Sequence, residues 1–119
     1  MTPAEHIETA KQFLADSDRE FLDGDELQAS EKLWGAASHA VMAIAEQHGL
    51  PYRNHKELKQ ATQTLAGEYG DTFFREGFSV AEKFHANFYH GFMEDFELSG
   101  DRPIVREFTT RVLELTAAA

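Results

Sequence analysis

Residues 26–51 read ELQASEKLWGAASHAVMAIAEQHGLP, and this stretch decides the fold. Apolar residues recur in it at helical spacing and form one stripe, which consists of Leu27, Trp34, Ala37, Val41 and Ile44. Small residues flank that stripe and allow neighbouring helices to approach closely. Gly49 and Pro51 then end the segment, because glycine suits a left-handed helix cap and proline cannot continue a helix. We therefore expect a central helix from Glu26 to about His48.

Start and stop signals on either side of this stretch indicate further helices. Residues 2–5, Thr-Pro-Ala-Glu, have the order of a capping box with proline in the first turn, so a helix should start there and end at Asp23-Gly24-Asp25. Residues 54–57 repeat the capping pattern and predict a third helix, which Gly70 closes. Ser79 is expected to cap a long helix over about 79–95, after a short turn that follows Gly77. A last helix is expected from about Pro103 to Thr116.

Five helices with short connections predict an all-α fold. No run alternates like a strand between turn signals, and no long repeat recurs along the chain. We expect an up-and-down four-helix bundle with one additional short or C-terminal helix, and one domain over residues 1–119. Trp34 and the alanine-rich central helix also fit a tetratricopeptide-like scaffold, but the 34-residue repeat of that class is missing.

The charge of the chain bears on its partners. The 119 residues carry 21 acidic and 11 basic side chains, a formal net charge of −10. Nucleic-acid binding depends largely on Lys and Arg contacts to phosphate, so nucleic acid is not an expected partner. Arg53, Lys56 and Lys59, with His55 beside them, form a small basic patch, which we interpret as the solvated start of a helix rather than a phosphate site.

Other absences in the sequence narrow the function classes. Cysteine is absent, which excludes disulfides, thiolate metal sites and a cysteine nucleophile. The first residues lack the basic start and apolar run of a signal peptide, and no stretch has the roughly 20 apolar residues of a membrane span. We therefore expect a cytoplasmic protein without membrane contact.

One motif raises the question of a metal centre. Glu82-x-x-His85 is half of the carboxylate-bridged di-iron signature of helical bundles, which needs a second such pair. None of the other five histidines has a carboxylate three residues before it. The sequence also lacks a G-x-S-x-G elbow, a phosphate-binding glycine loop and an H-E-x-x-H helix. We expect no metal, no cofactor and no catalytic residue.

A polar group interrupts the aromatic-rich region at residues 85–90, HANFYH. The candidate contact residues for a ligand or partner are His39, His85, Asn87, Tyr89 and His90. Two interpretations of His85 stay open. It is either a core histidine that bonds to Tyr89, Ser38 or His39, or part of a polar constellation that lines a groove or a dimer seam.

The phrases at residues 29–51, 54–58 (NHKEL) and 84–92 (FHANFYHGF) resemble small HEPN-like helical proteins. The resemblance is closest to an archaeal multi-copy family of unknown function with an H-x-N-F-Y signature, matched here by His85, Asn87, Phe88 and Tyr89. It implies a four-helix core with a short extra helix, and commonly a homodimer. Many HEPN domains are RNases with an Arg, four to six residues and then a His, but no Arg stands at that spacing before His85 or His90.

The sequence thus favours a non-catalytic, HEPN-like, homodimeric helical module for binding or interaction. Surplus apolar positions on the central and aromatic-rich helices also favour the homodimer. The alternative is an HEPN-type RNase toxin with a degenerate site around His85, Asn87, Tyr89 and His90. Other HEPN proteins are partners of nucleotidyltransferases, so such an enzyme, or an antitoxin-type protein, is a further candidate partner.

Overall fold

The structure is a computed structural model that describes residues 1–118. Within these residues the chain is helical and contains no strand. The helices are α1 (Pro3–Leu22), α2 (Glu26–Gln47), α3 (His55–Tyr69), α4 (Phe73–His90) and α5 (Asp95–Ala118).

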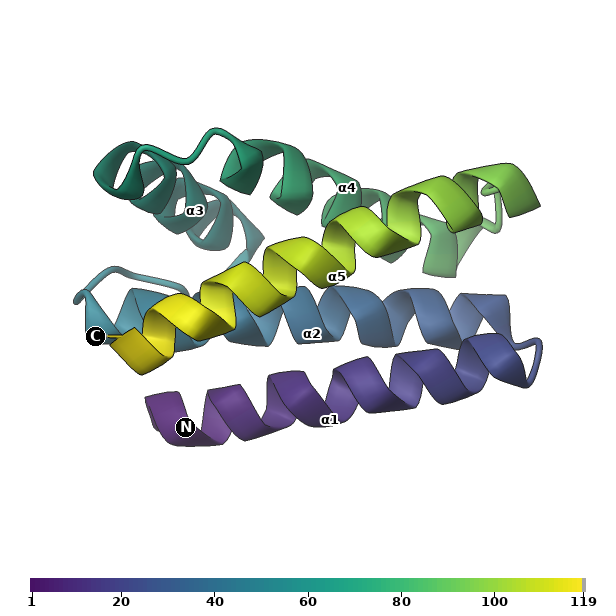
Figure 1. Cartoon of the computed structure of the whole chain (residues 1–119), viewed down its shortest axis with the longest axis horizontal. Coiled ribbons are helices and arrows are strands. Elements are labelled where there is room, and N and C mark those ends of the chain that lie inside the picture. Colours follow the sequence, from purple (N-terminus) through teal and green to yellow (C-terminus); the bar gives the residue numbers. More distant parts are fainter. Residues whose placement is uncertain (119) are drawn as a thin grey trace.

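The helices form an up-and-down bundle (Figure 1). α1 and α2 run antiparallel as one hairpin, and α4 and α5 form a second hairpin that lies across it. α3, the shortest helix, is inserted between α2 and α4 and covers one end of the bundle. The all-α bundle with one additional short helix that the sequence predicted is confirmed.

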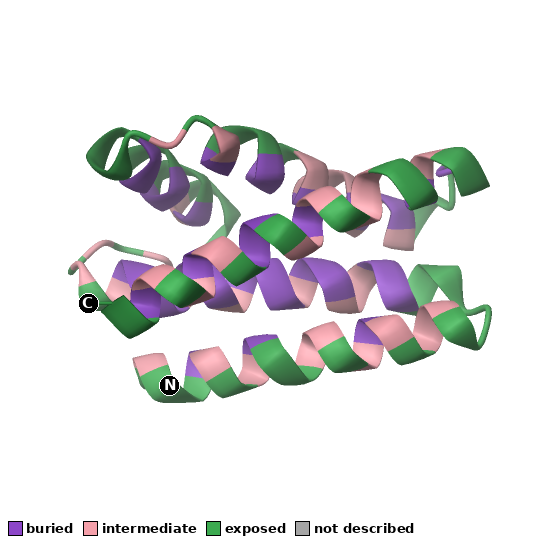
Figure 2. Cartoon of the chain, viewed as in Figure 1, coloured by how far each residue is buried: buried purple, intermediate pink, exposed green. Residues whose placement is uncertain are grey.

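α2 is the centre of the fold. It packs against each of the other four helices. Figure 2 shows that most of its length is buried, whereas α1 is exposed along much of its outer surface. The buried positions of α2 are mainly small, and they include Ala36, Ala37, Ala40 and Ala43, all without exposed surface. Small side chains let four helices approach one axis without leaving voids.

The predicted ends of the first three helices are confirmed. Thr2 and Glu5 form the complete capping box of α1. The Asn54 side chain accepts a hydrogen bond from the Glu57 N–H at the start of α3. Gly70 ends that helix with φ of 65°, a left-handed conformation that costs glycine little.

The expected break before Ser79 is wrong. α4 starts at Phe73, continues through Gly77 and ends before Gly91, so Ser79 lies exposed within the helix. Gly77 is present for packing: a Cβ at this position would lie 2.5 Å from the Cβ of Phe108 on α5. The glycine therefore allows α4 and α5 to make contact and does not interrupt the helix.

The expected start of the last helix near Pro103 is also wrong. α5 begins at Asp95 and includes Pro103 in its interior. Proline has no N–H, so the carbonyl of Ser99, one turn earlier, receives no helical hydrogen bond from it. Both residues are exposed, and water can satisfy that carbonyl. None of the helices within residues 1–118 is both long and apolar enough to cross a bilayer.

Candidate functional site

Two histidines lie on a tryptophan where α2, α3 and α4 meet. Trp34 comes from α2, His55 is the first residue of α3, and His85 lies on α4. The indole and imidazole centroids are 5.0 Å apart for His55 and 5.1 Å apart for His85, and the rings are stacked in both cases. The two imidazole centroids are 6.1 Å apart, far less than the sum of the two stacking distances. Both imidazoles therefore lie on the same face of the indole, and we call this group the histidine–tryptophan cluster.

A carboxylate orients each imidazole of the cluster. His85 Nδ1 lies 2.7 Å from Glu31 Oε1, and His55 Nε2 lies 2.7 Å from Glu82 Oε2. A carboxylate can only accept, so in each pair the imidazole N–H donates and the tautomer is fixed. His85 Nε2 and His55 Nδ1 have no hydrogen-bond partner within residues 1–118. These two nitrogens are the positions at which the cluster can accept a proton or bind a ligand.

A hollow of about 240 Å³ opens beside the cluster. All three cluster side chains line it, together with Tyr52 and Arg53 from the segment before α3. The hollow therefore combines aromatic surface with two imidazoles and a guanidinium. Oriented imidazoles of this kind can transfer protons or bind a polar ligand.

The basic patch adjoins this hollow but is largely neutralised. Arg53 donates to both carboxylate oxygens of Glu57, and this contact raises the pKa of Arg53 and lowers the pKa of Glu57. Lys59 Nζ lies 3.2 Å from Glu82. Lys56 is exposed at the start of α3. Two of the three predicted cations therefore already have a carboxylate partner, which weakens the patch as an anion site.

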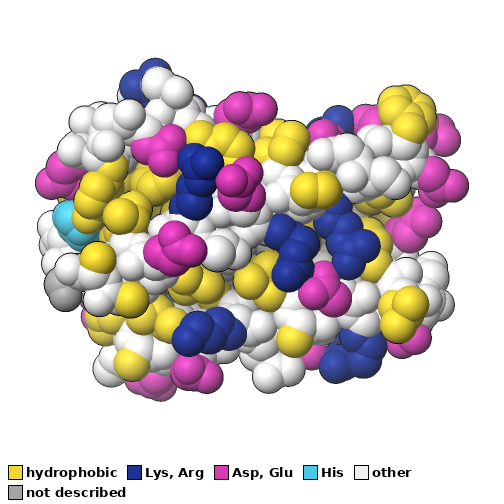
Figure 3. All heavy atoms as spheres, in the orientation of Figure 1, with side chains coloured by type: hydrophobic (Ala, Val, Ile, Leu, Met, Phe, Trp, Pro, Cys, Tyr) yellow, Lys and Arg dark blue, Asp and Glu magenta, His cyan; other side chains and the backbone are white. Residues whose placement is uncertain are grey.

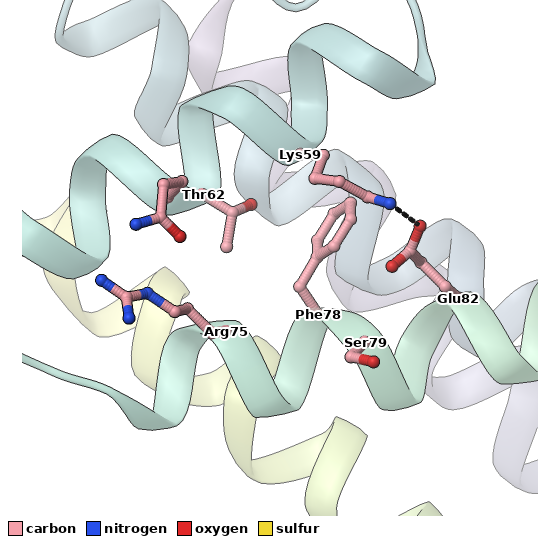
Figure 4. A pocket seen from close by; sticks show the side chains of 7 residues that line it. Lys59, Thr62, Arg75, Phe78, Ser79 and Glu82 are labelled. Carbon is pink, nitrogen blue, oxygen red and sulfur yellow. Dashed lines mark ion pairs between the residues drawn. The ribbon is translucent and has the colours of Figure 1, made fainter.

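A second hollow, of about 250 Å³, lies between α3 and α4 (Figure 4). Lys59 and Glu82 form an ion pair at one end of it, and the ring of Phe78 lies beside them. Arg75 lies at the other end. Because Glu82 accepts from both His55 and Lys59, this carboxylate connects the hollow to the histidine–tryptophan cluster.

Asn87, from the predicted polar cluster, is a buried connector. Its Oδ1 accepts a hydrogen bond from the Met93 N–H at 2.8 Å, and its Nδ2 donates to Ser30 Oγ at 3.1 Å. The side chain is 2% exposed. Asn87 thus fixes the turn between α4 and α5 and ties that turn to the first part of α2.

The last two residues of the predicted polar cluster differ in their surroundings. The Tyr89 ring packs edge-on against His85, with centroids 5.3 Å apart, and is largely exposed. Tyr89 therefore extends the histidine–tryptophan cluster toward the end of α4. His90 is exposed at the last position of α4.

The structure does not bring His39 to this group. His39 Nδ1 lies 2.9 Å from His6 Nδ1 on α1, and its ring packs against Phe13. Burial lowers the pKa of both His6 and His39, because a charged imidazole loses hydration there. At that distance one nitrogen must donate and the other accept, so the contact needs at least one neutral imidazole.

Three members of the site were missed at the level of sequence. Glu31 was not considered as a partner of His85, and Trp34 and His55 were assigned to the core and to the basic patch. No local pattern reveals these contacts, because they depend on how α2, α3 and α4 are rotated about their axes. The sequence could have predicted the His6–His39 contact, since an antiparallel hairpin about Gly24 brings those two positions together.

One end of the bundle exposes large apolar side chains. The two turns at this end, between α1 and α2 and between α4 and α5, carry five exposed hydrophobic residues: Leu22, Leu27, Tyr89, Phe92 and Phe96. The sequence placed Leu27 on the apolar stripe of the central helix, but its side chain is 42% exposed, and Phe92 is 44% exposed. Phe92 follows the end of α4, so it no longer shares the buried face of that helix. We call this surface the apolar end.

A metal centre would need several convergent ligands. Within residues 1–118, no three histidine, aspartate or glutamate side chains are arranged to hold a metal ion. The carboxylates of the histidine–tryptophan cluster are instead partners of the imidazoles.

The comparison with protein families gives a direct result. The model of the archaeal PaREP1/PaREP8 family matches residues 5–109. The chain belongs to this family. The match confirms the archaeal family that the H-x-N-F-Y signature indicated, while the wider HEPN relationship stays a prediction.

Structural comparison finds the same fold in a solved structure. The crystal structure of a protein from Sulfolobus solfataricus matches this PaREP1/PaREP8 chain with a TM-score of 0.80 and 18% sequence identity. The match covers 89% of this chain and 94% of the other. At this identity the likeness concerns the fold alone. No curated protein matches the sequence.

The role of Asn87 can be tested by stability. Asn87→Ala removes one acceptor and one donor from a buried site, so we expect the free energy of unfolding to fall by about 2–4 kcal/mol. His90→Ala, three residues on and exposed, should stay within about 0.5 kcal/mol of the wild type. Urea unfolding of the three proteins measures both values. Equal stability of Asn87→Ala and the wild type would contradict the connector role.

The His6–His39 contact predicts a pH dependence of stability. Both pKa values are lowered from 6.5 on folding, so below about pH 6.5 the unfolded chain binds protons more readily. The contribution of this contact to the free energy of unfolding is therefore complete above about pH 6.5, and it is lost as the pH falls below that value. Urea midpoints at pH 8 and pH 5.5 should differ more for the wild type than for His6→Gln, whereas His90→Gln should keep the wild-type difference.

Proposed function

We propose that this PaREP1/PaREP8 protein is a non-catalytic, HEPN-like helical module that binds another protein through its apolar end. The observation that carries the proposal is where the large exposed hydrophobic side chains lie. Seven are exposed within residues 1–118, and five of them are at the apolar end. Contiguous apolar surface on a small soluble domain is typical of an interaction site.

The aromatic character of this surface supports the same function. Phe96 is 77% exposed, Tyr89 is 66% exposed, and Phe92 lies between them in sequence. Aromatic side chains are enriched at protein interfaces, because they bury much area for little loss of conformational freedom. The surface joins two turns, which Asn87 holds in place through Met93 and Ser30. A partner would therefore meet a preformed surface.

The homodimer that the sequence predicted stays a proposal. α2 cannot supply much of a dimer interface, because the other four helices already cover most of α2. Of the surplus apolar surface on these two helices, Leu27 at the start of α2 and Tyr89 at the end of α4 stay exposed. A second copy, a nucleotidyltransferase and an antitoxin-type protein all remain candidate partners.

Site-specific photo-crosslinking in cells tests the proposal. A photoreactive phenylalanine analogue at position 96 should crosslink to a protein, because that side chain would lie in the interface. The same analogue at position 69 is the matched control, since Tyr69 is also an exposed aromatic residue but lies at the end of α3. Crosslinks of equal yield at both positions, or at neither, would contradict the proposal. A product of twice 13.4 kDa would identify the partner as a second copy.

One specific observation favours RNA cleavage as a second candidate function. His55 and His85 line the same hollow, each has a carboxylate partner, and each keeps one nitrogen free. Two such imidazoles can act as the base and the acid of a phosphodiester transfer. Two features oppose RNA cleavage. The chain carries a net charge of −10, and Arg53 and Lys59 are already paired with carboxylates.

An RNA cleavage assay decides between the two functions. We expect no cleavage of single-stranded RNA or transfer RNA by the wild type, because the negative field and the paired cations oppose phosphate binding. Cleavage that is lost in both His55→Ala and His85→Ala, but kept in His90→Ala, would replace the binding module with an enzyme.

A further inference from the structure

The apolar end is also acidic. Its two turns carry five exposed carboxylates: Asp23, Asp25, Glu26, Glu94 and Asp95. None of them forms an ion pair within residues 1–118, and residues 22–28 and 89–96 contain no Lys or Arg. Hydrophobic and acidic side chains gather at the right-hand end of Figure 3, where both turns lie.

Most carboxylates elsewhere on the molecule have a cationic partner within residues 1–118. Arg102 and Arg106 both contact Asp18, and Lys83 contacts Glu97 and Asp101. On the face shown in Figure 3, Lys and Arg side chains lie beside Asp and Glu side chains over α5. The negative potential of the apolar end is therefore not cancelled locally, as it is along α5.

A hollow of about 330 Å³ lies at the centre of the apolar end, between the two turns. Leu27 and Met93 give it an apolar lining, and Asp25 and Glu26 add carboxylates. A further hollow of about 200 Å³ lies beside it and is lined in part by Glu26, Asp95 and Arg102. The Arg102 guanidinium is paired with Asp18, not with Glu26 or Asp95. Each hollow thus places apolar surface next to unpaired negative charge.

We propose that the apolar end binds a cationic, apolar segment of another protein. A large apolar side chain of the partner occupies the hollow at Leu27 and Met93, and its Lys or Arg side chains meet Asp25, Glu26 and Asp95. This inference rests on the proposed function and adds the chemistry of the partner. Electrostatic complementarity of this kind selects the partner and accelerates the encounter.

The same charges disfavour the other occupants of this surface. In a two-fold symmetric contact the surface meets a copy of itself, so the five carboxylates would face one another without an intervening cation. Phosphate groups of a nucleic acid or an anionic membrane would be repelled in the same way. A homodimer formed through another face of the bundle is not affected by this argument.

Peptide binding, measured by fluorescence anisotropy, tests the chemistry. The probe is a labelled amphipathic peptide of leucine and lysine, and its counterpart has glutamate in place of every lysine. We expect the lysine peptide to bind, the glutamate peptide not to bind, and the affinity to fall as salt is added.

Two variants locate the contact. Asp25→Asn, Glu26→Gln and Asp95→Asn together should weaken binding of the lysine peptide roughly tenfold or more. The matched control combines Glu8→Gln, Glu107→Gln and Glu114→Gln, which remove the same charge from exposed positions elsewhere. It should change the affinity far less. The variant Leu27→Ser with Phe92→Ser should also lose binding, and urea unfolding confirms that each variant is folded.

The outcomes separate this inference from the proposed function. Equal loss of affinity in the matched control would overturn it, because binding would then follow net charge alone. Binding of the glutamate peptide, or a dimer that Leu27→Ser with Phe92→Ser dissolves, would overturn the cationic partner but keep the apolar end as an interaction site. Failure to crosslink from position 96, together with no binding of either peptide, would overturn both.

Discussion

The close packing of four helices around α2 is the constraint on which the rest of the structure depends. α2 presents small side chains to its neighbours. Glycine residues also allow close approach at two helix contacts, α1 with α2 and α4 with α5. A Cβ at Gly35 would lie 2.9 Å from Phe13 on α1, and one at Gly77 would overlap Phe108 on α5. Larger residues at these positions would force the helices apart. The two helices of each hairpin therefore pack closely because a glycine lies at their contact.

Trp34 is the large exception on α2, and its position organises the histidine–tryptophan cluster. Its ring is 9% exposed, so α3 and α4 must pack around it rather than against alanine. His55 and His85 lie on one face of the indole, and Phe78 contacts it edge-on. Both imidazoles are partly exposed, and each has a carboxylate partner, Glu82 for His55 and Glu31 for His85. Packing on one aromatic ring has thus brought titratable groups from three helices to one hollow.

The sequence predicted the features that depend on local chemistry. Thr2, Asn54 and Gly70 end their helices as expected, because a cap involves only neighbours along the chain. Gly77 and Pro103 misled the prediction, since both are local signals for a break. In the fold, the first is required by the contact with Phe108, and the second loses a hydrogen bond that water can replace.

The candidate site was less predictable than the fold for a physical reason. His85 was singled out, but Glu31 lies 54 positions away in the sequence, and their contact depends on the rotation of α2 and α4 about their axes. Asn87 was named as a contact residue for a ligand or partner, but its side chain is buried and bonds to the turn after α4, whose position was misjudged. Apolar periodicity shows which face of a helix is buried, but not which neighbour that face meets.

Pro103 gives α5 unequal stiffness along its length. The missing hydrogen bond to Ser99, with Gly100 between them, leaves residues 95–102 joined to the rest of the helix by a weakened turn. Both parts are anchored in the core, the later one by Val105, Phe108 and Val112 and the earlier one by Leu98, two residues after Phe96. Ion pairs of Lys83 with Glu97 and Asp101 also tie the earlier part to α4. Side-chain packing and ion pairs, more than the backbone hydrogen bonds of α5 itself, therefore hold Phe96 in position at the apolar end.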